Sequence, residues 1–168
     1  MGERSGVVTK SQIQVGESLP SVLLCEGTPD KTVNISEFKQ GKVVIFGLPG
    51  AFTPTCSSEH VPGFVKSVDA IKKKGVEAVI CIATNDPFVM SAWGKNLDPE
   101  GKIRFLADPR AEFVKATGLS IDLTPVLGGI RSKRFIMVVA DGKVKFISVE
   151  PDGTSLTCSR ATDILKML

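Results

Sequence analysis

Apolar residues along this chain follow two periods, one typical of strands and one typical of helices. Four short apolar runs predict strands, at residues 21–26, 42–48, 76–83 and 103–107. After residue 60 the apolar residues fall on one face of a helix, at Val61, Phe64, Val65, Val68 and Ile71. Pro62 lies inside this helix and is expected to kink it. Three lysines followed by Gly75 are typical of the helix end.

Two later helices are predicted where an acidic or amide residue precedes a proline. Asn85 or Asp86 can cap a helix that has Pro87 at its first position and runs to about residue 96. Asp108 and Pro109 repeat this pattern, which predicts a helix that ends at residue 118.

The sequence near the end of the chain predicts a β-hairpin, and this hairpin indicates a mixed sheet. Asp141 and Gly142 separate apolar runs at 134–140 and 143–149, as in a two-residue β-turn, and a short helix follows near 162–168. After the first strand, the order is β-α-β-α-β-α-β-β-α. Three helical crossovers and a terminal hairpin predict an α/β fold with a central mixed β-sheet flanked by helices on both faces. The hairpin favours a thioredoxin-like sheet over a fully parallel one.

Composition and charge narrow the class of protein. The 168 residues fit a single domain over 1–168, and 42% hydrophobic with 23% charged residues is an ordinary globular mixture. The apolar runs are far shorter than the roughly 20 residues of a membrane span. Basic and acidic residues are interspersed and give a net charge of only +3, so the sequence does not indicate the basic surface that binds nucleic acid. We therefore expect neither a nucleic acid nor a membrane as partner.

The cysteines point to redox chemistry rather than to a metal. The chain has 4 cysteines, none at metal-ligand spacing from another, and His60 is its only histidine, so neither a zinc site nor another cofactor is expected. A chain of this length buries a core without disulfides, which leaves structural or redox-active thiols and favours an intracellular location. Met1–Lys10 is too polar for a signal peptide, and Lys166–Leu168 is a poor peroxisomal signal. We expect a cytoplasmic or mitochondrial protein.

Cys56 is the thiol that the sequence places in a special environment. Thr53 is the expected N-cap and Pro54 the first helical residue, so Cys56 falls in the first turn. Free backbone N–H groups and the helix dipole favour an anion there, and a thiolate is one. The dipole contributes only about 0.3–1 kcal/mol, and an ordinary thiol is only about 3% ionised at neutral pH. A second cation is therefore needed for a thiolate to dominate, and the candidates are Arg104, Arg110, Arg131, Arg134 and Arg160. The alternative is that Cys56 is merely a small residue at a helix start.

The pattern Pro49-x-x-x-Thr53-x-x-Cys56 resembles the peroxidatic motif of peroxiredoxins, which are thiol peroxidases built on a thioredoxin fold. The longer stretch FGLPGAFTPTCSSEHVPGF at 46–64 is similar to the type II, or peroxiredoxin-5, subfamily. Four further stretches resemble the same subfamily, namely GVEAVICIATNDPFVMSAWG at 75–94, LADP at 106–109, KRF at 133–135 and VEPDGTSLTCS at 149–159. The similarity covers almost the whole chain after Gln14, although segment 121–130 departs from the pattern of the human-type members.

The resemblance implies roles for five residues. Cys56 would attack the terminal peroxide oxygen as a thiolate and become a sulfenic acid. Thr53 would hold the peroxide or the thiolate through its hydroxyl, and Pro49 would shield the thiol from water. Arg134 would donate to the thiolate and to the peroxide oxygens. The backbone N–H groups of Gly50 and Cys56 would help to polarise the peroxide. Plain structural roles are the alternatives: an N-cap for Thr53, a strand end for Pro49 and a surface basic cluster for Arg134.

The resemblance also implies how the oxidised sulfur is resolved. Cys158 matches the resolving cysteine, which lies in a flexible loop and would form an intramolecular disulfide with Cys56. Thioredoxin would be the reductant, as glutaredoxin or glutathione is in some relatives. Cys81 is the alternative resolving thiol, because plant type II relatives use a cysteine at that spacing, but its apolar surroundings favour a buried structural thiol. Cys25 is interpreted as structural, and a homodimer is expected.

The sequence also allows a prediction for His60 and a comparison with two alternative functions. His60 lies one turn after Cys56, which predicts a position near the mouth of the site. A dithiol disulfide reductase is disfavoured because Thr53 stands where such enzymes have the first cysteine of Cys-x-x-Cys, whereas a monothiol reductase stays open as an alternative. A non-catalytic redox sensor would not need the complete motif. The leading hypothesis is a thiol peroxidase for hydrogen peroxide, alkyl hydroperoxides and peroxynitrite.

Overall fold

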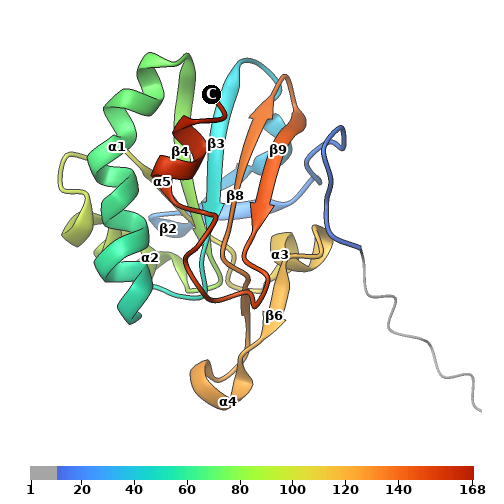
Figure 1. Cartoon of the computed structure of the whole chain (residues 1–168). Coiled ribbons are helices and arrows are strands. Elements are labelled where there is room, and N and C mark those ends of the chain that lie inside the picture. Colours follow the sequence, from blue (N-terminus) through green and yellow to red (C-terminus); the bar gives the residue numbers. More distant parts are fainter. Residues whose placement is uncertain (1–10) are drawn as a thin grey trace, which may run out of the picture.

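A computed structural model describes residues 11–168 and arranges them around one seven-stranded sheet (Figure 1). Met1–Lys10, for which the sequence predicts no signal peptide, lies outside the described residues. The strand order is β2-β1-β5-β4-β3-β8-β9, and β6 pairs with β7 in a separate ribbon. The strands are β1 (Leu23–Glu26), β2 (Thr28–Asn34), β3 (Lys42–Gly47), β4 (Val76–Ala83), β5 (Arg104–Ala107), β6 (Ser120–Asp122), β7 (Ile130–Ser132), β8 (Phe135–Ala140) and β9 (Lys143–Val149).

Helices of three kinds connect these strands. They are the 3₁₀ turn η1 (Ile35–Glu37), the π-helical turn η2 (Cys56–His60), and the α-helices α1 (Val61–Lys73), α2 (Pro87–Leu97), α3 (Glu112–Ala116), α4 (Thr124–Leu127) and α5 (Ala161–Leu165). Within residues 11–168, every helix is too short or too polar to cross a membrane.

The sheet is mixed, as the sequence predicts. Strands β3, β4 and β5 run parallel, and α1 and α2 form the crossovers between them. The β8–β9 hairpin adds to this centre through antiparallel pairing of β8 with β3. Asp141 and Gly142 both have positive φ, 52° and 79°, which a two-residue hairpin turn of type I′ requires. The predicted turn is therefore confirmed.

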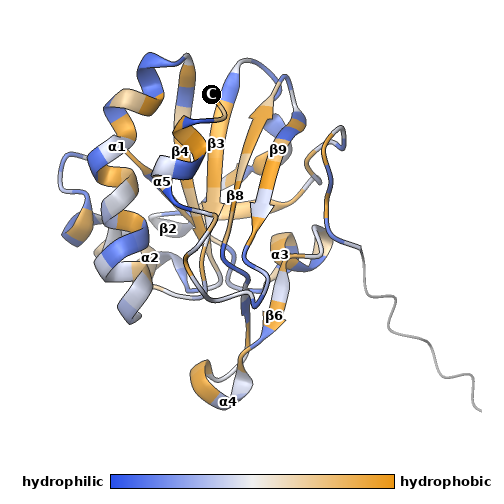
Figure 2. Ribbon diagram, in the orientation of Figure 1, coloured by the Kyte–Doolittle hydropathy of each residue, from blue (hydrophilic) through white to orange (hydrophobic). Residues whose placement is uncertain are grey.

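Helices cover both faces of the sheet, which confirms the α/β prediction. Helices α1, α2 and α5 lie on one face and α3 on the other (Figure 1). Strand β3 serves both layers, since Val44 and Phe46 belong to one apolar cluster and Val43 and Ile45 to the other. Figure 2 shows the result in the central strands β3, β4 and β8, which are apolar along most of their length. A strand buried on both faces reads as an unbroken apolar run, which is why the sequence reveals β3 and β4 so clearly.

The two predicted helix caps have different outcomes. Asp86, not Asn85, caps α2, because its carboxylate accepts from the amides of Phe88 and Val89. The helix start predicted at Pro109 is wrong. Chain segment 108–110 forms a turn, and α3 begins only at Glu112 and ends at Ala116 rather than at residue 118. Asp108 still accepts from the amides of Phe113 and Val114 in α3. It therefore caps this helix although it lies several residues before the first helical residue.

Three strands and a short helix are not predicted from the sequence. Strand β2 has the polar sequence TPDKTVN and lies at the edge of the sheet, where little of it is buried. The segment β6–α4–β7 projects from the body of the molecule (Figure 1). Each of its elements has only three or four residues, too few for a period to be recognised. The last helix also spans Ala161–Leu165 rather than 162–168.

Candidate active site

Cys56 lies in the first turn of the helix that follows β3. The carbonyl of Thr53 accepts from the amide of Ser57 at 3.0 Å, so the helix begins where the sequence predicts. Cys56 then opens the π-helical turn η2, in which the amide of Val61 donates to its carbonyl. Pro62 has no N–H for the preceding turn, and the expected kink takes the form of this wider turn. Such turns occur frequently at functional sites. The Cys56 side chain is buried, with only 1% of the residue exposed.

Arg134 is the cation that the fold brings to the Cys56 sulfur. It immediately precedes β8, is 2% exposed, and donates from Nη2 to Sγ of Cys56 at 3.3 Å. Its other donors reach Nδ1 of His60 at 3.0 Å and the carbonyl of Thr154 at 3.0 Å. Within residues 11–168, Arg134 takes part in no ion pair with a carboxylate. A buried cation without a carboxylate partner is costly, and the Cys56 sulfur lies within hydrogen-bond distance of this one.

The other candidate arginines have partners elsewhere. Three of them pair with carboxylates, namely Arg104 with Glu26, Arg110 with Glu112 and Arg160 with Asp163. Arg131 donates to the carbonyls of Leu127 at 3.0 Å and Pro49 at 3.4 Å. Arg131 therefore ties the β6–β7 ribbon to the loop that carries Pro49, without contacting the sulfur.

His60 is buried beneath the C-terminal loop, and the expectation that it lies at the mouth of the site is wrong. It is 1% exposed, and its Nε2 is 2.8 Å from the carbonyl of Ser159. A carbonyl only accepts, so Nε2 carries the proton and Nδ1 accepts from Arg134. Burial, followed by the nearby charge of Arg134, lowers the pKa of His60 to about 3. The imidazole is therefore neutral, and it connects Arg134 with the residue that follows Cys158.

The loop before the helix is held by side chains from three places. The hydroxyl of Thr53 donates to the carbonyl of Gly50 at 2.7 Å, and among the described residues it accepts from no helix amide. The amide of Ala51 donates to Oδ1 of Asn85 at 2.8 Å, which explains why Asn85 does not cap α2. A Cβ on Gly50 would lie 3.0 Å from Nη1 of Arg131, so a larger residue here would have to displace the end of that side chain. Sequence reasoning missed the role of Asn85 because its partner lies 34 positions away.

A pocket of about 470 Å³ lies over this loop and Arg134. It brings together three of the predicted site residues, Pro49, Thr53 and Arg134, while Gly50 packs behind them. The remaining lining residues are Pro54, Thr55, Leu123, Val126, Leu127, Thr154 and Ser155. The aliphatic ones belong to the loop and helix around α4, which no sequence signal connected with the site. The pocket therefore has a polar floor and an apolar wall.

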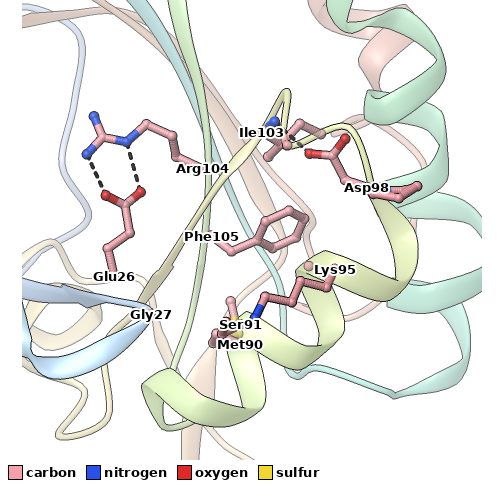
Figure 3. Close-up of a pocket in the computed structure, with 12 residues that line it drawn as sticks. Glu26, Gly27, Met90, Ser91, Lys95, Asp98, Ile103, Arg104 and Phe105 are labelled. Carbon is pink, nitrogen blue, oxygen red and sulfur yellow. Dashed lines mark hydrogen bonds and ion pairs between the residues drawn. The ribbon is translucent and has the colours of Figure 1, made fainter.

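A second pocket, of about 300 Å³, shares no lining residue with the first (Figure 3). Figure 3 shows its two polar contacts, the paired hydrogen bonds from Arg104 to Glu26 and the bond from the amide of Ile103 to Asp98. None of its lining residues is a cysteine or a histidine. Cys56 lines neither of these two pockets, but Arg134, which contacts the Cys56 sulfur, lines the first one.

The remaining cysteines differ in exposure. Cys158 is partly exposed, and its sulfur lies 3.7 Å from the carbonyl of Val149 rather than against Cys56. Its loop was expected to be flexible, but a buried carboxylate, Glu150, binds residues 157–159. Cys81 is fully buried in β4, where burial and then nearby Cys56 raise its pKa well above the ordinary value. All four thiols are free in the structure.

Comparisons with known proteins identify the family. The Redoxin family model matches residues 14–165. Peroxiredoxin-2B of Arabidopsis thaliana is 42% identical over 160 residues, which is 93% of this chain and 98% of the relative. The crystal structure of reduced Prx3 in complex with H₂O₂ from Vibrio vulnificus has a TM-score of 0.86 and 40% identity, covering 94% of this chain and 100% of the other. Peroxiredoxin 5 from Alvinella pompejana has a TM-score of 0.78 and 43% identity, covering 84% of this chain and 92% of the other.

The chain therefore belongs to the Redoxin family. Within that family it is a type II peroxiredoxin with a thioredoxin-like fold. The protein is a thiol-dependent peroxidase, an oxidoreductase that acts on peroxide. Membership of this family implies peroxide substrates and a thioredoxin-like reductant.

Proposed function

We propose that Cys56 is the peroxidatic residue of a single catalytic domain over residues 1–168. Its thiolate attacks the terminal oxygen of the peroxide and the O–O bond breaks. The sulfur becomes a sulfenic acid, and the alkoxide or hydroxide that leaves takes a proton from solvent. One observation carries this proposal, namely the bond of 3.3 Å from the buried Arg134 guanidinium to the Cys56 sulfur. The same guanidinium can stabilise charge on the leaving oxygen as it develops.

The other pocket residues would bind and orient the peroxide. The Thr53 hydroxyl lines the pocket and can turn from the Gly50 carbonyl to a peroxide oxygen. The backbone N–H of Cys56 belongs to a first helical turn, where amides have no partner within the helix, and together with that of Gly50 it would polarise the peroxide. Pro49 lines the pocket and limits the access of water to the thiol. We assign these four residues with Arg134 to substrate binding and catalysis.

The pocket suits peroxides of different sizes. A volume of about 470 Å³ with an apolar wall of Leu123, Val126 and Leu127 admits alkyl hydroperoxides as well as hydrogen peroxide. Peroxynitrite is a small anion, and Arg134 would attract it. We therefore propose the same three substrate types that the sequence indicates.

Cys158 is the proposed resolving residue. Its thiol attacks the sulfenic acid of Cys56, which gives an intramolecular disulfide and releases water. Cys158 is partly exposed and its neighbour Ser159 contacts His60, whereas burial keeps the Cys81 thiol protonated. A thioredoxin dithiol then reduces the disulfide to two thiols, and glutaredoxin or glutathione is the alternative reductant.

A homodimer in a reducing compartment completes the proposal. Phe52 and Phe88 are 58% and 61% exposed, which is unusual for phenylalanine, while Trp93 is buried in the core. A second copy that covers these rings would remove apolar surface from water. We place the enzyme in the cytoplasm or the mitochondrion, because a thiol cycle that ends in a free dithiol needs a reducing pool.

Peptide mass mapping tests the roles of the two cysteines. The reduced protein is treated with one equivalent of hydrogen peroxide, its free thiols are alkylated, and the peptides are analysed without reduction. We expect a Cys56–Cys158 disulfide, and no peroxide consumption by a Cys56→Ser variant, with Cys25→Ser as a matched control that behaves as the unmodified protein. A Cys56–Cys81 disulfide would contradict the role of Cys158. Unmodified Cys56 beside consumed peroxide would contradict the assignment of the peroxidatic residue.

A further inference from the structure

One buried carboxylate binds three consecutive residues with Cys158 at their centre. Glu150 follows β9 and is 1% exposed. Its oxygens accept from the Thr157 amide at 2.6 Å, the Thr157 hydroxyl at 2.6 Å, the Cys158 amide at 2.8 Å and the Ser159 hydroxyl at 2.8 Å. We call residues 157–159 the Cys158 segment. Every member of this segment is thus bound to the same side chain.

These bonds are strong because the carboxylate is charged. Burial alone would raise the pKa of Glu150, but the bonds from Thr157, Cys158 and Ser159 lower it to about 2. Hydrogen bonds to a charged acceptor are roughly twice as strong as neutral ones. The Cys158 segment is therefore fixed in the reduced protein, where a mobile loop was expected.

The segment is also bound on the side that faces the peroxidatic site. The Ser159 carbonyl accepts from His60 at 2.8 Å, and the Glu150 amide donates to the Arg134 carbonyl at 3.0 Å. Glu150, which binds the Cys158 segment, and Arg134, which contacts Cys56, are therefore joined by a hydrogen bond between their backbones. In this arrangement the Cys158 sulfur contacts the Val149 carbonyl. A disulfide requires the two sulfurs to come within about 2.05 Å, so the segment has to rearrange first.

We propose that Glu150 is a positioning residue that holds Cys158 in its reduced place, and that release of the Cys158 segment from Glu150 limits the rate of disulfide formation. This inference rests on the proposed role of Cys158. The chemical step is unchanged: the Cys158 thiol displaces the sulfenic oxygen as water, and the peroxide already consumed is the only oxidant. Until release, the sulfenic acid of Cys56 persists. A second peroxide can then oxidise it to a sulfinic acid, with water or an alcohol as the other product.

Glu150 would therefore set the partition between recycling and overoxidation. A weaker bond network would favour conformations in which Cys158 can reach Cys56, because removing contacts made only in one state shifts the population toward the other. Disulfide formation should then be faster and the yield of sulfinic acid lower.

The test follows the two oxidation steps separately in the full-length reduced protein. Trp93 is the only tryptophan, and its Nε1 donates to the hydroxyl of Ser57, next to Cys56, at 3.1 Å, so its fluorescence can report the first oxidation. Rapid acid quenching and mass analysis measure sulfenic acid, disulfide and sulfinic acid over time. The variants are Glu150→Gln, Thr157→Val, which loses only the hydroxyl bond, and Ser159→Ala. Glu100→Gln, at an exposed ion pair with Lys102, is the matched control.

We expect disulfide formation to be about tenfold faster in Glu150→Gln, because a neutral amide accepts these hydrogen bonds less strongly than a carboxylate does. Thr157→Val and Ser159→Ala should give smaller increases, on the order of threefold. The rate of the first oxidation should change far less than the rate of disulfide formation. The sulfinic acid formed at excess peroxide should decrease in the same order.

The outcomes separate this inference from the proposed function. Equal or slower disulfide formation in Thr157→Val and Ser159→Ala would overturn the role of Glu150, even where Glu150→Gln does not fold. Absence of any Cys56–Cys158 disulfide in the unmodified protein would instead overturn the proposed role of Cys158, and this inference with it.

Discussion

The Arg134 guanidinium donates to the unprotonated Nδ1 of His60 over 3.0 Å, inside the protein and one turn away from Cys56. The opposite ring nitrogen of His60 donates to the Ser159 carbonyl. A protonated imidazole would have no acceptor for Arg134 and would place two cations side by side. The arrangement therefore exists only with a neutral histidine, and this sets how the protein responds to acid.

Stability should fall as the pH drops below about 6.5, because of His60. In the unfolded chain this residue takes up a proton near pH 6.5, whereas the folded pKa is about 3, so the unfolded state binds more protons between these values. At pH 5 the expected loss is roughly 2 kcal/mol relative to pH 7. Urea unfolding at pH 7, 6 and 5 measures it. His60→Gln, which keeps a donor for Ser159, should be less stable at pH 7 by roughly 1–3 kcal/mol and should lose less on acidification.

A second group controls the more acidic range. Stability contributed by Glu150 is present above pH 4.5 and is lost as the pH falls toward its folded pKa of about 2. The loss of stability between pH 6.5 and pH 5 is therefore attributed to His60. An equal loss in that window in His60→Gln and in the unmodified protein would contradict this explanation.

Replacing Arg134 should slow the first oxidation. Arg134→Met removes the donor to the Cys56 sulfur, and we expect the second-order rate constant with hydrogen peroxide to fall about 100-fold. Arg134→Lys should recover only part of it, since an ammonium group does not reproduce three differently directed bonds. Stopped-flow fluorescence of Trp93 gives the rate. Arg110→Met, at a highly exposed ion pair, is the control, and an undiminished rate in Arg134→Met would direct attention to Arg131.

Cys158 and Cys81 should differ in turnover. Cys158→Ser is expected to keep the first oxidation and to lose steady-state reduction by thioredoxin, because no partner thiol remains for the sulfenic acid. Cys81→Ala should keep turnover and cost roughly 1–2 kcal/mol of stability, as a truncation in a buried strand does. Coupled oxidation of NADPH through thioredoxin reductase measures turnover. The reverse pattern would show that the strand cysteine resolves the sulfenic acid.

The apolar wall of the pocket should affect organic substrates more than hydrogen peroxide. Leu127→Ala shortens a side chain that lines this wall, and we expect kcat/KM for cumene hydroperoxide to fall about 3- to 10-fold. The value for hydrogen peroxide should stay within about twofold, because this substrate has no apolar group to bind. Leu23→Ala, at an exposed leucine outside the pocket lining, is the control. Equal losses for the two peroxides would mean that Leu127 shapes the loop rather than the substrate preference.

Local patterns predict the parts of the fold that depend on neighbours in sequence. Strand β4 has the predicted bounds, Val76–Ala83, because six of its eight residues are buried and all but Glu77 are apolar. The turn at Asp141 and Gly142 follows from the two residue types alone. Strand β2 could not be found in this way, since its partner β1 stabilises a polar segment at the sheet edge.

In the site, too, the features set by neighbours in sequence are predictable, and those set by distant residues are not. The motif identifies Cys56 and Thr53, which lie on one segment, and the family resemblance indicates Arg134. The burial of His60 depends on Ser159, 99 positions away, and the role of Glu150 depends on how the C-terminal loop returns to β9. Hydrogen bonds of this range leave no periodic signal in the sequence.

Both edges of the sheet have features that hinder the addition of strands from other molecules. At one edge, β2 exposes Pro29, Asp30 and Lys31, so it offers one amide fewer and two charges to an approaching strand. At the other, the segment around Gly16 bonds to Val144 and covers part of β9. If the C-terminal loop rearranges in each catalytic cycle, as proposed above, each cycle would bring a risk of aggregation. Both features make the addition of a strand from a neighbouring copy less favourable, so the contacts of the proposed dimer would form at loops and helix ends.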